Sequence, residues 1–271
     1  MIKQGGTYVV MGLLDHESIS YAVGKTIEKF GGKVIYTVQN EKFKRVFLDR
    51  GSELSEDEVN ALNIEFCDVT IDEQIKTLFE KIGRIDGVVH SIAFANPRTC
   101  LGAEFHTDAV DDIKQGFHIS CVSLARVTKY AQLAMPQGGS VVTLTFDSRN
   151  AYAFYNWMSV NKAALEALVR NLARRHGKDL VRVNAVSAGP LFTKAASKIP
   201  GFGNLSDTWQ VISPLPWDTE ADKYEIANAV AFLLGPYSKK ITGQTVFVDG
   251  GASIIGGQML PHERAAVEAT V

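Results

Sequence analysis

Short apolar segments alternate along the chain with longer segments whose apolar residues recur at helical spacing. The short segments are rich in β-branched residues and lack regular polar alternation, which is typical of strands buried on both faces of a parallel sheet. They lie at residues 8–11, 34–38, 63–66, 87–90, 141–145, 181–186 and 245–248. Helices are expected to begin near Ser18, Ile71, Thr107, Ala153 and Thr219. This alternation predicts an α/β fold with a doubly wound parallel sheet covered on both faces.

No internal repeat, low-complexity tract or Pro/Ser linker divides the 271 residues, so we expect one domain over residues 1–260. The longest segment without a clear helical or strand pattern is 191–217. It contains Pro200, Gly201, Gly203, Pro214 and Pro216. Because loops of this length commonly act as lids or binding elements, we expect it to cover a substrate. Residues 261–271 are expected to form a helical or frayed tail, to which we assign no function.

Composition limits the partners and the compartment. A net charge of −2 without long runs of one sign predicts neither a nucleic-acid nor a membrane partner. Cys67, Cys100 and Cys121 lack metal-ligand spacing, so we expect free thiols, no metal site and a reducing compartment. The chain passes from residues 1–6 directly into a strand, and no stretch is long enough to cross a bilayer. We therefore expect a cytoplasmic protein.

The turn after the first strand has features of a phosphate site. Gly12 ends the strand, and Ser18 is a candidate N-cap of the following helix. A bare backbone and free N–H groups at a helix start suit a pyrophosphate. Only the first glycine of the G-x-G-x-x-G fingerprint is present, so this turn alone leaves a phosphate site and an ordinary strand-to-helix turn equally open.

The end of the second strand bears on the choice of cofactor. Gln39 stands where many NAD-binding units carry an acidic residue for the adenosine ribose, and its amide can still bind a hydroxyl. Lys42, Lys44 and Arg45 follow, within reach of a 2′-phosphate, but each is more typical of a solvated helix face. NADH is therefore favoured as cofactor, and NADPH stays open.

Polar residues also follow the third and fourth strands. Asp68 and Ser91 lie at strand ends, where doubly wound sheets bind ligands. His90 continues a buried strand, and such a histidine is more often a hydrogen-bonded core residue than a catalytic group.

Tyr155 and Lys162 follow the fifth strand and are the candidate catalytic pair. Seven residues make nearly two helical turns, so both side chains are expected on one helix face. A lysine there can hold ribose hydroxyls and lower the phenol pKa, which makes Tyr155 a better proton donor. For an arbitrary tyrosine and lysine, packing and solvation would be the better interpretation. Their position at a strand end in a nucleotide-binding frame favours catalysis.

From about Tyr8 to Ile255 the chain resembles the type I enoyl-acyl carrier protein reductases, a divergent branch of the short-chain dehydrogenase/reductases with a Rossmann-like fold. The Tyr-x-x-x-Lys pair of ordinary members is absent, because Tyr152 is followed four residues later by Asn156. The segments that carry the resemblance are 12–19, 39–40, 67–69, 90–95, 155–162, 187–190, Thr193 and 248–251.

The resemblance implies transfer of a hydride from the nicotinamide to C3 of a trans-2-enoyl thioester in fatty acid synthesis. Tyr155 would hydrogen-bond the enolate oxygen, and Lys162 would hold the nicotinamide ribose. The thioester would be carried by acyl carrier protein or coenzyme A, and the enzyme would be a homotetramer. Positions matching the family's cofactor contacts are Gly12, Ser18, Ile19, Gln39, Asp68, Val69, Ser91, Ile92, Ala93, Ile119, Lys162, Pro190, Leu191 and Thr193.

Two departures from the family pattern are informative. Phe146 stands where many bacterial members carry a second tyrosine, which is similar to the long-chain, mycolate-pathway branch, as are segments 155–158 and 214–217. Phe146 is expected to pack beside the nicotinamide and the substrate, although a simple core aromatic is nearly as well supported. Basic residues beside the lid are missing across 200–205, which weakens delivery by a carrier protein and leaves coenzyme A open.

Two alternatives remain at the level of sequence. A ketone or quinone reductase could use the same Tyr155 and Lys162 frame. The incomplete glycine fingerprint also permits a non-catalytic protein that senses a dinucleotide, although the intact pair favours an enzyme.

Overall fold

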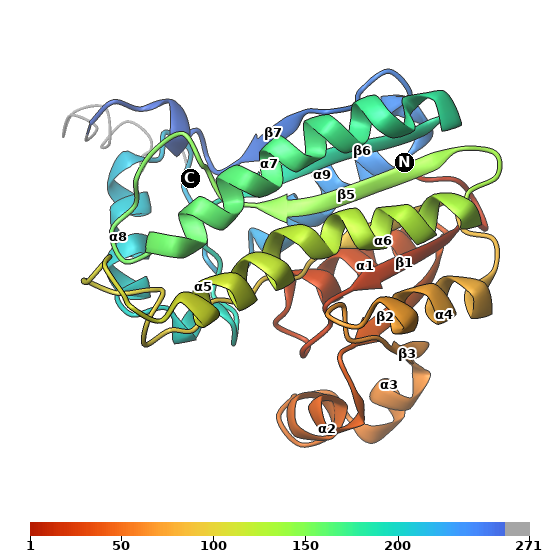
Figure 1. The fold of residues 1–271 in the computed structure, drawn as a ribbon, viewed down its shortest axis with the longest axis horizontal. Helices are drawn as coiled ribbons and strands as arrows, with labels where there is room; N and C mark the ends of the chain where they lie inside the picture. The colour runs from red at the N-terminus through yellow and green to blue at the C-terminus, as the bar shows by residue number, and fades with distance from the viewer. Residues whose placement is uncertain (258–271) are drawn as a thin grey trace.

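The structure, a computed structural model, describes residues 1–257. Within them, seven parallel strands form one sheet in the order β3-β2-β1-β4-β5-β6-β7 (Figure 1). The strands are β1 (Thr7–Met11), β2 (Lys33–Val38), β3 (Ile64–Phe66), β4 (Gly87–His90), β5 (Gly139–Thr145), β6 (Val181–Ala188) and β7 (Thr245–Val248). The predicted doubly wound parallel sheet is confirmed.

Helices cover both faces of the sheet, with α4, α6 and α7 on one side and α1 and α9 on the other (Figure 1). The α-helices are α1 (Ile19–Lys29), α2 (Glu41–Phe43), α3 (Glu56–Ala61), α4 (Asp72–Ile82), α5 (Val110–Phe117), α6 (Ser123–Ala131), α7 (Asn156–His176), α8 (Phe202–Ile212) and α9 (Lys223–Leu234). A π-helical turn, η1 (Lys44–Asp49), follows α2, and another, η2 (His118–Val122), joins α5 to α6.

Alternate residues of each strand feed two separate cores. In β1, Val9 and Met11 pack among residues of α4, α6 and α7, whereas Tyr8 and Val10 pack with α1 and α9. This division follows from the two-residue period of a strand, which sends successive side chains to opposite faces. Both faces are apolar because both are covered, and the strand ends alone are left for polar chemistry.

Several predicted helix boundaries are corrected. Helix α5 begins at Val110 rather than near Thr107, whose hydroxyl accepts a hydrogen bond from the Ala109 N–H in a local turn. Helix α9 begins at Lys223 rather than near Thr219. The segment 191–217, which showed no pattern, contains α8, whose Leu205 and Trp209 are buried one turn apart. Glycines and prolines around α8 conceal this helical spacing in the sequence.

The helical segment expected for Lys42, Lys44 and Arg45 is formed by α2 and η1. Helix α3 was not predicted, although it carries a readable signal. The Ser55 hydroxyl accepts from the Glu58 N–H, and the Glu58 carboxylate accepts from the Ser55 N–H, which forms a capping box. None of the helices described in residues 1–257 is long and apolar enough to cross a membrane. The tail predicted at 261–271 lies outside the described residues.

Candidate active site

A cavity of about 840 Å³ opens at the carboxyl ends of the strands, where the order of the sheet reverses between β1 and β4. Ligands of doubly wound sheets bind at this switch point. Every residue predicted for the catalytic or cofactor site lines this one cavity. They are Gly12, Ser18, Ile19, Gln39, Asp68, Val69, Ser91, Ile92, Ala93, Ile119, Phe146, Tyr155, Lys162, Pro190, Leu191 and Thr193.

The turn after β1 requires glycine at position 12. Gly12 has φ of 90°, and a Cβ there would overlap the carbonyl oxygen of Ser91 at the end of β4. The Gly12 and Leu13 N–H groups both donate to the Thr37 carbonyl, at 3.2 and 3.0 Å. The glycine therefore serves close packing between neighbouring strand ends, in addition to leaving bare backbone beside the cavity.

Ser18 occupies the N-cap position of α1 but does not cap it through its side chain. Its hydroxyl accepts from the Leu14 and Asp15 N–H groups, at 3.3 and 3.0 Å. The predicted N-cap position of Ser18 is confirmed, but its hydroxyl closes the loop before the helix instead of capping the helix. The first N–H groups of α1 thus stay uncovered by this side chain, as an anion site requires.

Gln39 and Asp68 meet at the end of the cavity formed by β2 and β3. Gln39 Nε2 donates to Asp68 Oδ2 at 2.8 Å, and Thr70 Oγ1 donates to Asp68 Oδ1 at 2.6 Å. Burial opposes ionisation of Asp68, but these hydrogen bonds hold its pKa below the usual value. A carboxylate is therefore present where an adenosine ribose would lie in this fold.

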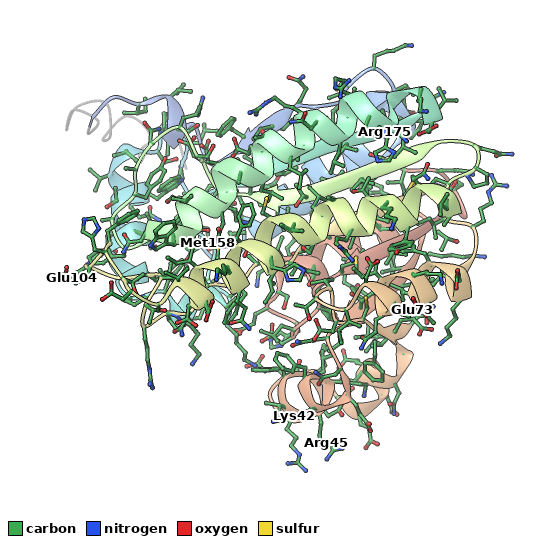
Figure 2. All side chains as sticks on the ribbon, viewed as in Figure 1. Lys42, Arg45, Glu73, Glu104, Met158 and Arg175 are labelled. Atoms are coloured by element: carbon green, nitrogen blue, oxygen red, sulfur yellow. The ribbon has the colours of Figure 1, made fainter. Side chains whose placement is uncertain are left out.

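Two of the three cations after β2 pair within their own helical segment. Lys44 pairs with Asp49 at 2.7 Å, and Arg45 approaches Glu41 at 3.8 Å. Lys42 and Arg45 extend away from the rest of the molecule (Figure 2). This placement agrees with the solvated helix face favoured by the sequence.

His90 is a core residue, as predicted. It is fully buried, and its Nδ1 and Nε2 lie 3.0 and 2.8 Å from the hydroxyls of Thr143 and Ser123. Burial, assisted by the nearby Lys162 charge, lowers the pKa of His90 to about 3. The ring is therefore neutral and is held between β5 and the first residue of α6, without a role at the cavity.

Tyr155 lies immediately before α7, in a strained segment, rather than on the helix itself. Phe154 has φ of 67° and Asn156 has φ of 25°, conformations that side-chain-bearing residues seldom adopt. Asn156 Nδ2 donates to the carbonyls of Gly102 and Glu104, at 2.7 and 3.0 Å. The Gly102 N–H in turn donates to the Phe154 carbonyl at 3.0 Å. The loop around residue 102 therefore holds Tyr155 at the cavity.

The pKa shifts of Tyr155 and Lys162 differ from those expected from the sequence. Burial raises the pKa of Tyr155, so the expected lowering of the phenol pKa by Lys162 is not found. Lys162 is itself buried, which lowers its pKa to about 8, while the nearby Glu166 carboxylate acts in the opposite direction. Its Nζ donates to the Leu144 carbonyl at 2.9 Å. Tyr155 is thus a protonated donor, and Lys162 a cation held at the strand end.

Phe146 belongs to an aromatic cluster that backs Tyr155. Its ring centroid lies 4.9 Å from that of Tyr155, 4.7 Å from Tyr152 and 5.5 Å from Trp209. Phe146 is buried as a core aromatic and also lines the cavity, and its expected packing beside the nicotinamide and the substrate stays a prediction. The Tyr152 hydroxyl donates to Asp147 Oδ2 at 2.9 Å, so this hydroxyl has a structural hydrogen-bond partner.

The apolar part of the cavity was not predicted from the sequence. It is lined by Pro97, Leu101, Met158, Phe202 and Leu205, from the loop after β4, α7 and α8. Loop residues carry no periodic signal, and α8 was not recognised as a helix. The combined walls offer polar groups along the strand ends and an apolar region beside Tyr155, which suits a dinucleotide together with an apolar substrate.

Comparison with models of protein families matches residues 12–253 to the family described as Enoyl-(Acyl carrier protein) reductase. The chain belongs to this family. Among enoyl-acyl carrier protein reductases, it is 36% identical over 254 residues to the NADPH enzyme FabI of Staphylococcus aureus, covering 90% of this chain and 95% of that protein. It is also 36% identical over 264 residues to the NADH enzyme FabI of Bacillus cereus, covering 94% and 99%.

A crystal structure of the Bacillus cereus enoyl-acyl carrier protein reductase with NADP+ and indole naphthyridinone is also similar. It superposes with a TM-score of 0.82 at 33% identity, over 94% of this chain and 98% of that one. The family resemblance and the Rossmann-like fold predicted from the motifs are confirmed. The assignment to the long-chain branch stays a prediction.

Proposed function

We propose that this enoyl-acyl carrier protein reductase uses NADH to reduce the trans-2 double bond of enoyl thioesters in fatty acid synthesis. The observation that carries the proposal is the placement of Tyr155 and Lys162 in the same cavity as the turn at Gly12 and the polar pair of Gln39 and Asp68. Relatives named for NADH and for NADPH both support a nicotinamide dinucleotide. NADPH therefore stays open as a second cofactor.

The side chains divide the work along the cavity. When bound, NADH supplies the hydride that is added to C3 of the substrate. The Tyr155 hydroxyl, kept protonated by burial, donates a hydrogen bond to the thioester oxygen as that oxygen gains charge. Lys162 holds the nicotinamide ribose and adds a positive charge near the reacting atoms. A proton from solvent then completes C2.

The remaining cavity residues bind the cofactor. Backbone at Gly12 and the start of α1 face the pyrophosphate, together with the Thr193 hydroxyl, and Gln39 and Asp68 face the adenosine. Phe146 supports Tyr155 and borders the nicotinamide. The other positions form apolar or backbone walls, namely Ser18, Ile19, Val69, Ser91, Ile92, Ala93, Ile119, Pro190 and Leu191.

Four further properties belong to the proposal. Residues 1–260 form the catalytic domain, and 191–217, including α8, form the substrate lid. The thioester arrives on acyl carrier protein or coenzyme A. The protein is a homotetramer, which is supported by exposed apolar side chains on α5 and α7, among them Val110, Phe117 and Val160. It resides in the cytoplasm, where the three buried thiols stay reduced.

One assay tests the reaction. NADH and NADPH oxidation are followed with trans-2-enoyl thioesters of several chain lengths, each linked to coenzyme A and to acyl carrier protein. We expect turnover with enoyl thioesters and a preference for NADH. Oxidation only with a panel of ketones or quinones would identify the alternative reductase, and NADH binding without any turnover would identify the sensing protein. Light scattering coupled to size exclusion measures the oligomeric state independently.

A further inference from the structure

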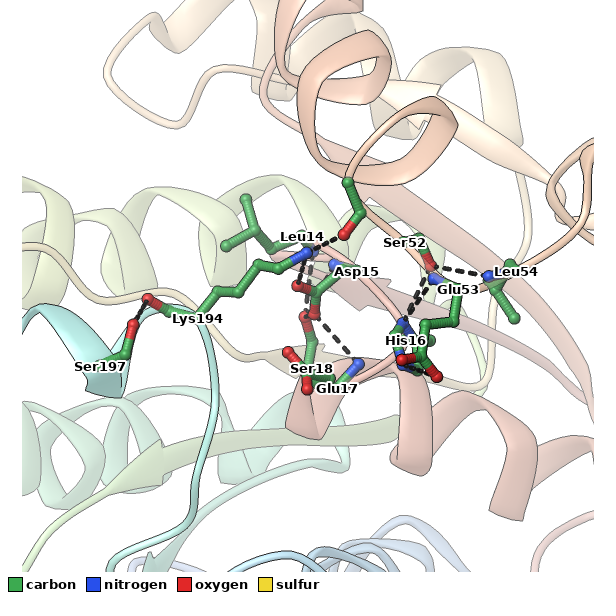
Figure 3. A network of polar contacts seen from close by, with 11 residues as sticks. Leu14, Asp15, His16, Glu17, Ser18, Ser52, Glu53, Leu54, Lys194 and Ser197 are labelled. Carbon is green, nitrogen blue, oxygen red and sulfur yellow. Dashed lines mark hydrogen bonds and ion pairs between the residues drawn. The ribbon is translucent and has the colours of Figure 1, made fainter. Parts of the chain in front are cut away.

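Asp15 is a buried carboxylate in the loop between Gly12 and α1. The residue has no exposed surface. Its Oδ1 accepts from the Glu17 N–H at 3.1 Å and from the Ser18 hydroxyl at 3.0 Å (Figure 3). The loop therefore satisfies one carboxylate oxygen by itself and leaves the second to a partner from elsewhere in the fold.

That partner is Lys194, at the start of the lid. Its Nζ lies 3.0 Å from Asp15 Oδ2, as an ion pair without the directed geometry of a hydrogen bond (Figure 3). The same ammonium donates to the Gly51 carbonyl, in the segment after η1. Lys194 is flanked by Thr193 and Ala195, which line the cavity, whereas its own side chain is not part of the lining.

Three other contacts stabilise the junction. Residues 193–197 form a turn in which the Ser197 N–H donates to the Thr193 carbonyl at 2.9 Å, and the Ser197 hydroxyl donates to the Lys194 carbonyl at 2.9 Å. On the other side of the loop, His16 Nδ1 lies 3.0 Å from the Ser52 hydroxyl (Figure 3). The lid, the loop after β1 and the segment at 51–52 thus meet around one buried charge.

The negative charge of Asp15 opposes the binding of cofactor phosphates beside its loop. A buried carboxylate without a counter-ion is costly, and its field disfavours phosphates bound beside the same loop. Lys194 removes both penalties, but only while the start of the lid stays against the loop. The compensation of Asp15 is therefore coupled to the position of the lid.

We propose that Lys194 is a positioning residue that latches the lid to the pyrophosphate loop through Asp15, and that this pair sets how tightly and how long the dinucleotide is held. The inference rests on the proposed function in placing the cofactor phosphates beside residues 12–19. Neither residue touches the reacting atoms, so the effect falls on the affinity and release of NADH and on its KM more than on kcat.

The test measures the dissociation constant and release rate of NADH by fluorescence for the wild-type enzyme, Lys194→Met, Asp15→Asn and the double variant. Removing one partner of a buried charge pair acts mainly on dissociation, so Lys194→Met should raise both quantities about tenfold. Adding Asp15→Asn removes the uncompensated charge, so the double variant should bind NADH more tightly than Lys194→Met alone. Lys194→Arg should retain most of the affinity. Thermal unfolding without NADH verifies that each variant is folded.

Lys42→Met is the matched control, because Lys42 is an exposed lysine that extends away from the molecule (Figure 2). It should leave NADH affinity within about twofold of wild type. The latch is wrong if Lys194→Met binds and releases NADH like the wild type while enoyl thioesters are still reduced. It is also wrong if the double variant is as weak as Lys194→Met, since the effect then does not pass through Asp15. Failure of the wild-type enzyme to bind NADH would overturn the proposed function and the latch together.

Discussion

The ammonium group of Lys162 donates a 2.9 Å hydrogen bond to the carbonyl of Leu144, next to the end of β5. This bond fixes a buried cation beside the position proposed for the nicotinamide ribose. The lysine comes from α7 and the carbonyl from the sheet, so the bond also ties the start of α7 to the strand end. Its strength depends on the charge of the lysine, and burial makes that charge sensitive to pH.

Affinity for NADH should fall as pH rises through about 8, because burial lowers the pKa of Lys162 to about 8 and the cation is lost above that pH. Without cofactor, the free energy of unfolding should rise over the interval from this pKa to the normal lysine pKa, since the unfolded chain then binds the extra proton. Fluorescence titrations with NADH across this range measure the first effect. Lys162→Met should bind NADH weakly with a flat pH profile, and an unchanged affinity would remove Lys162 from the ribose site.

Replacing Tyr155 with Phe should lower kcat about a hundredfold to a thousandfold, because one donor to the developing enolate oxygen is lost. NADH affinity should stay within about twofold, since the hydroxyl is assigned to the substrate. Because burial raises the pKa of Tyr155, ionisation of the phenol should not limit the wild-type enzyme near neutral pH. Tyr152→Phe is the matched control, as its hydroxyl serves Asp147, and it should cost far less. Equal rates for Tyr155→Phe and wild type would exclude the proposed donor.

The strands and the strand-end residues could be predicted because they obey one simple constraint. Burial on both faces makes the strands apolar, so Gly12, Gln39, Asp68 and Ser91 stand out where the strands end, and the parallel topology gathers them at one cavity. The strain at Phe154 could not be predicted, because a positive φ at a residue other than glycine leaves no mark in composition.

The contact between Asp15 and Lys194 was equally hidden. It joins loops far apart in the sequence, and neither residue belongs to a periodic pattern. The pKa of Tyr155 was predicted in the wrong direction because pairing with Lys162 was weighed without burial, and burial raises this pKa. Sequence thus locates groups that follow regular elements, whereas their protonation depends on surroundings that only the fold defines.

Gly12→Ala should weaken both folding and NADH binding. The substitution meets a φ of 90° and the Ser91 carbonyl, so we expect a loss of about 2 to 4 kcal/mol in the free energy of unfolding, from a left-handed backbone together with overpacking. Chemical denaturation measures the loss, and fluorescence measures NADH affinity. Gly177→Ala is the control, since a Cβ there meets no atom within 4 Å. If Gly12→Ala is as stable as the control, the close approach of β1 and β4 is not as described.

Both the backbone conformation and the side-chain amide of Asn156 should support kcat, and two substitutions separate the two contributions. Asn156→Gly removes both hydrogen bonds to the carbonyls of Gly102 and Glu104 but tolerates the φ of 25°, whereas Asn156→Ala removes the bonds and keeps the strain. Because Tyr155 adjoins this residue, kcat should decrease in the order wild type, Asn156→Gly, Asn156→Ala, with little change in NADH affinity. Steady-state kinetics with an enoyl thioester, alongside NADH titration, gives both quantities. Equal kcat for the two variants would mean that the backbone conformation at residue 156 does not affect the position of Tyr155. Equal kcat for all three proteins would mean that the loop around residue 102 does not support the active site.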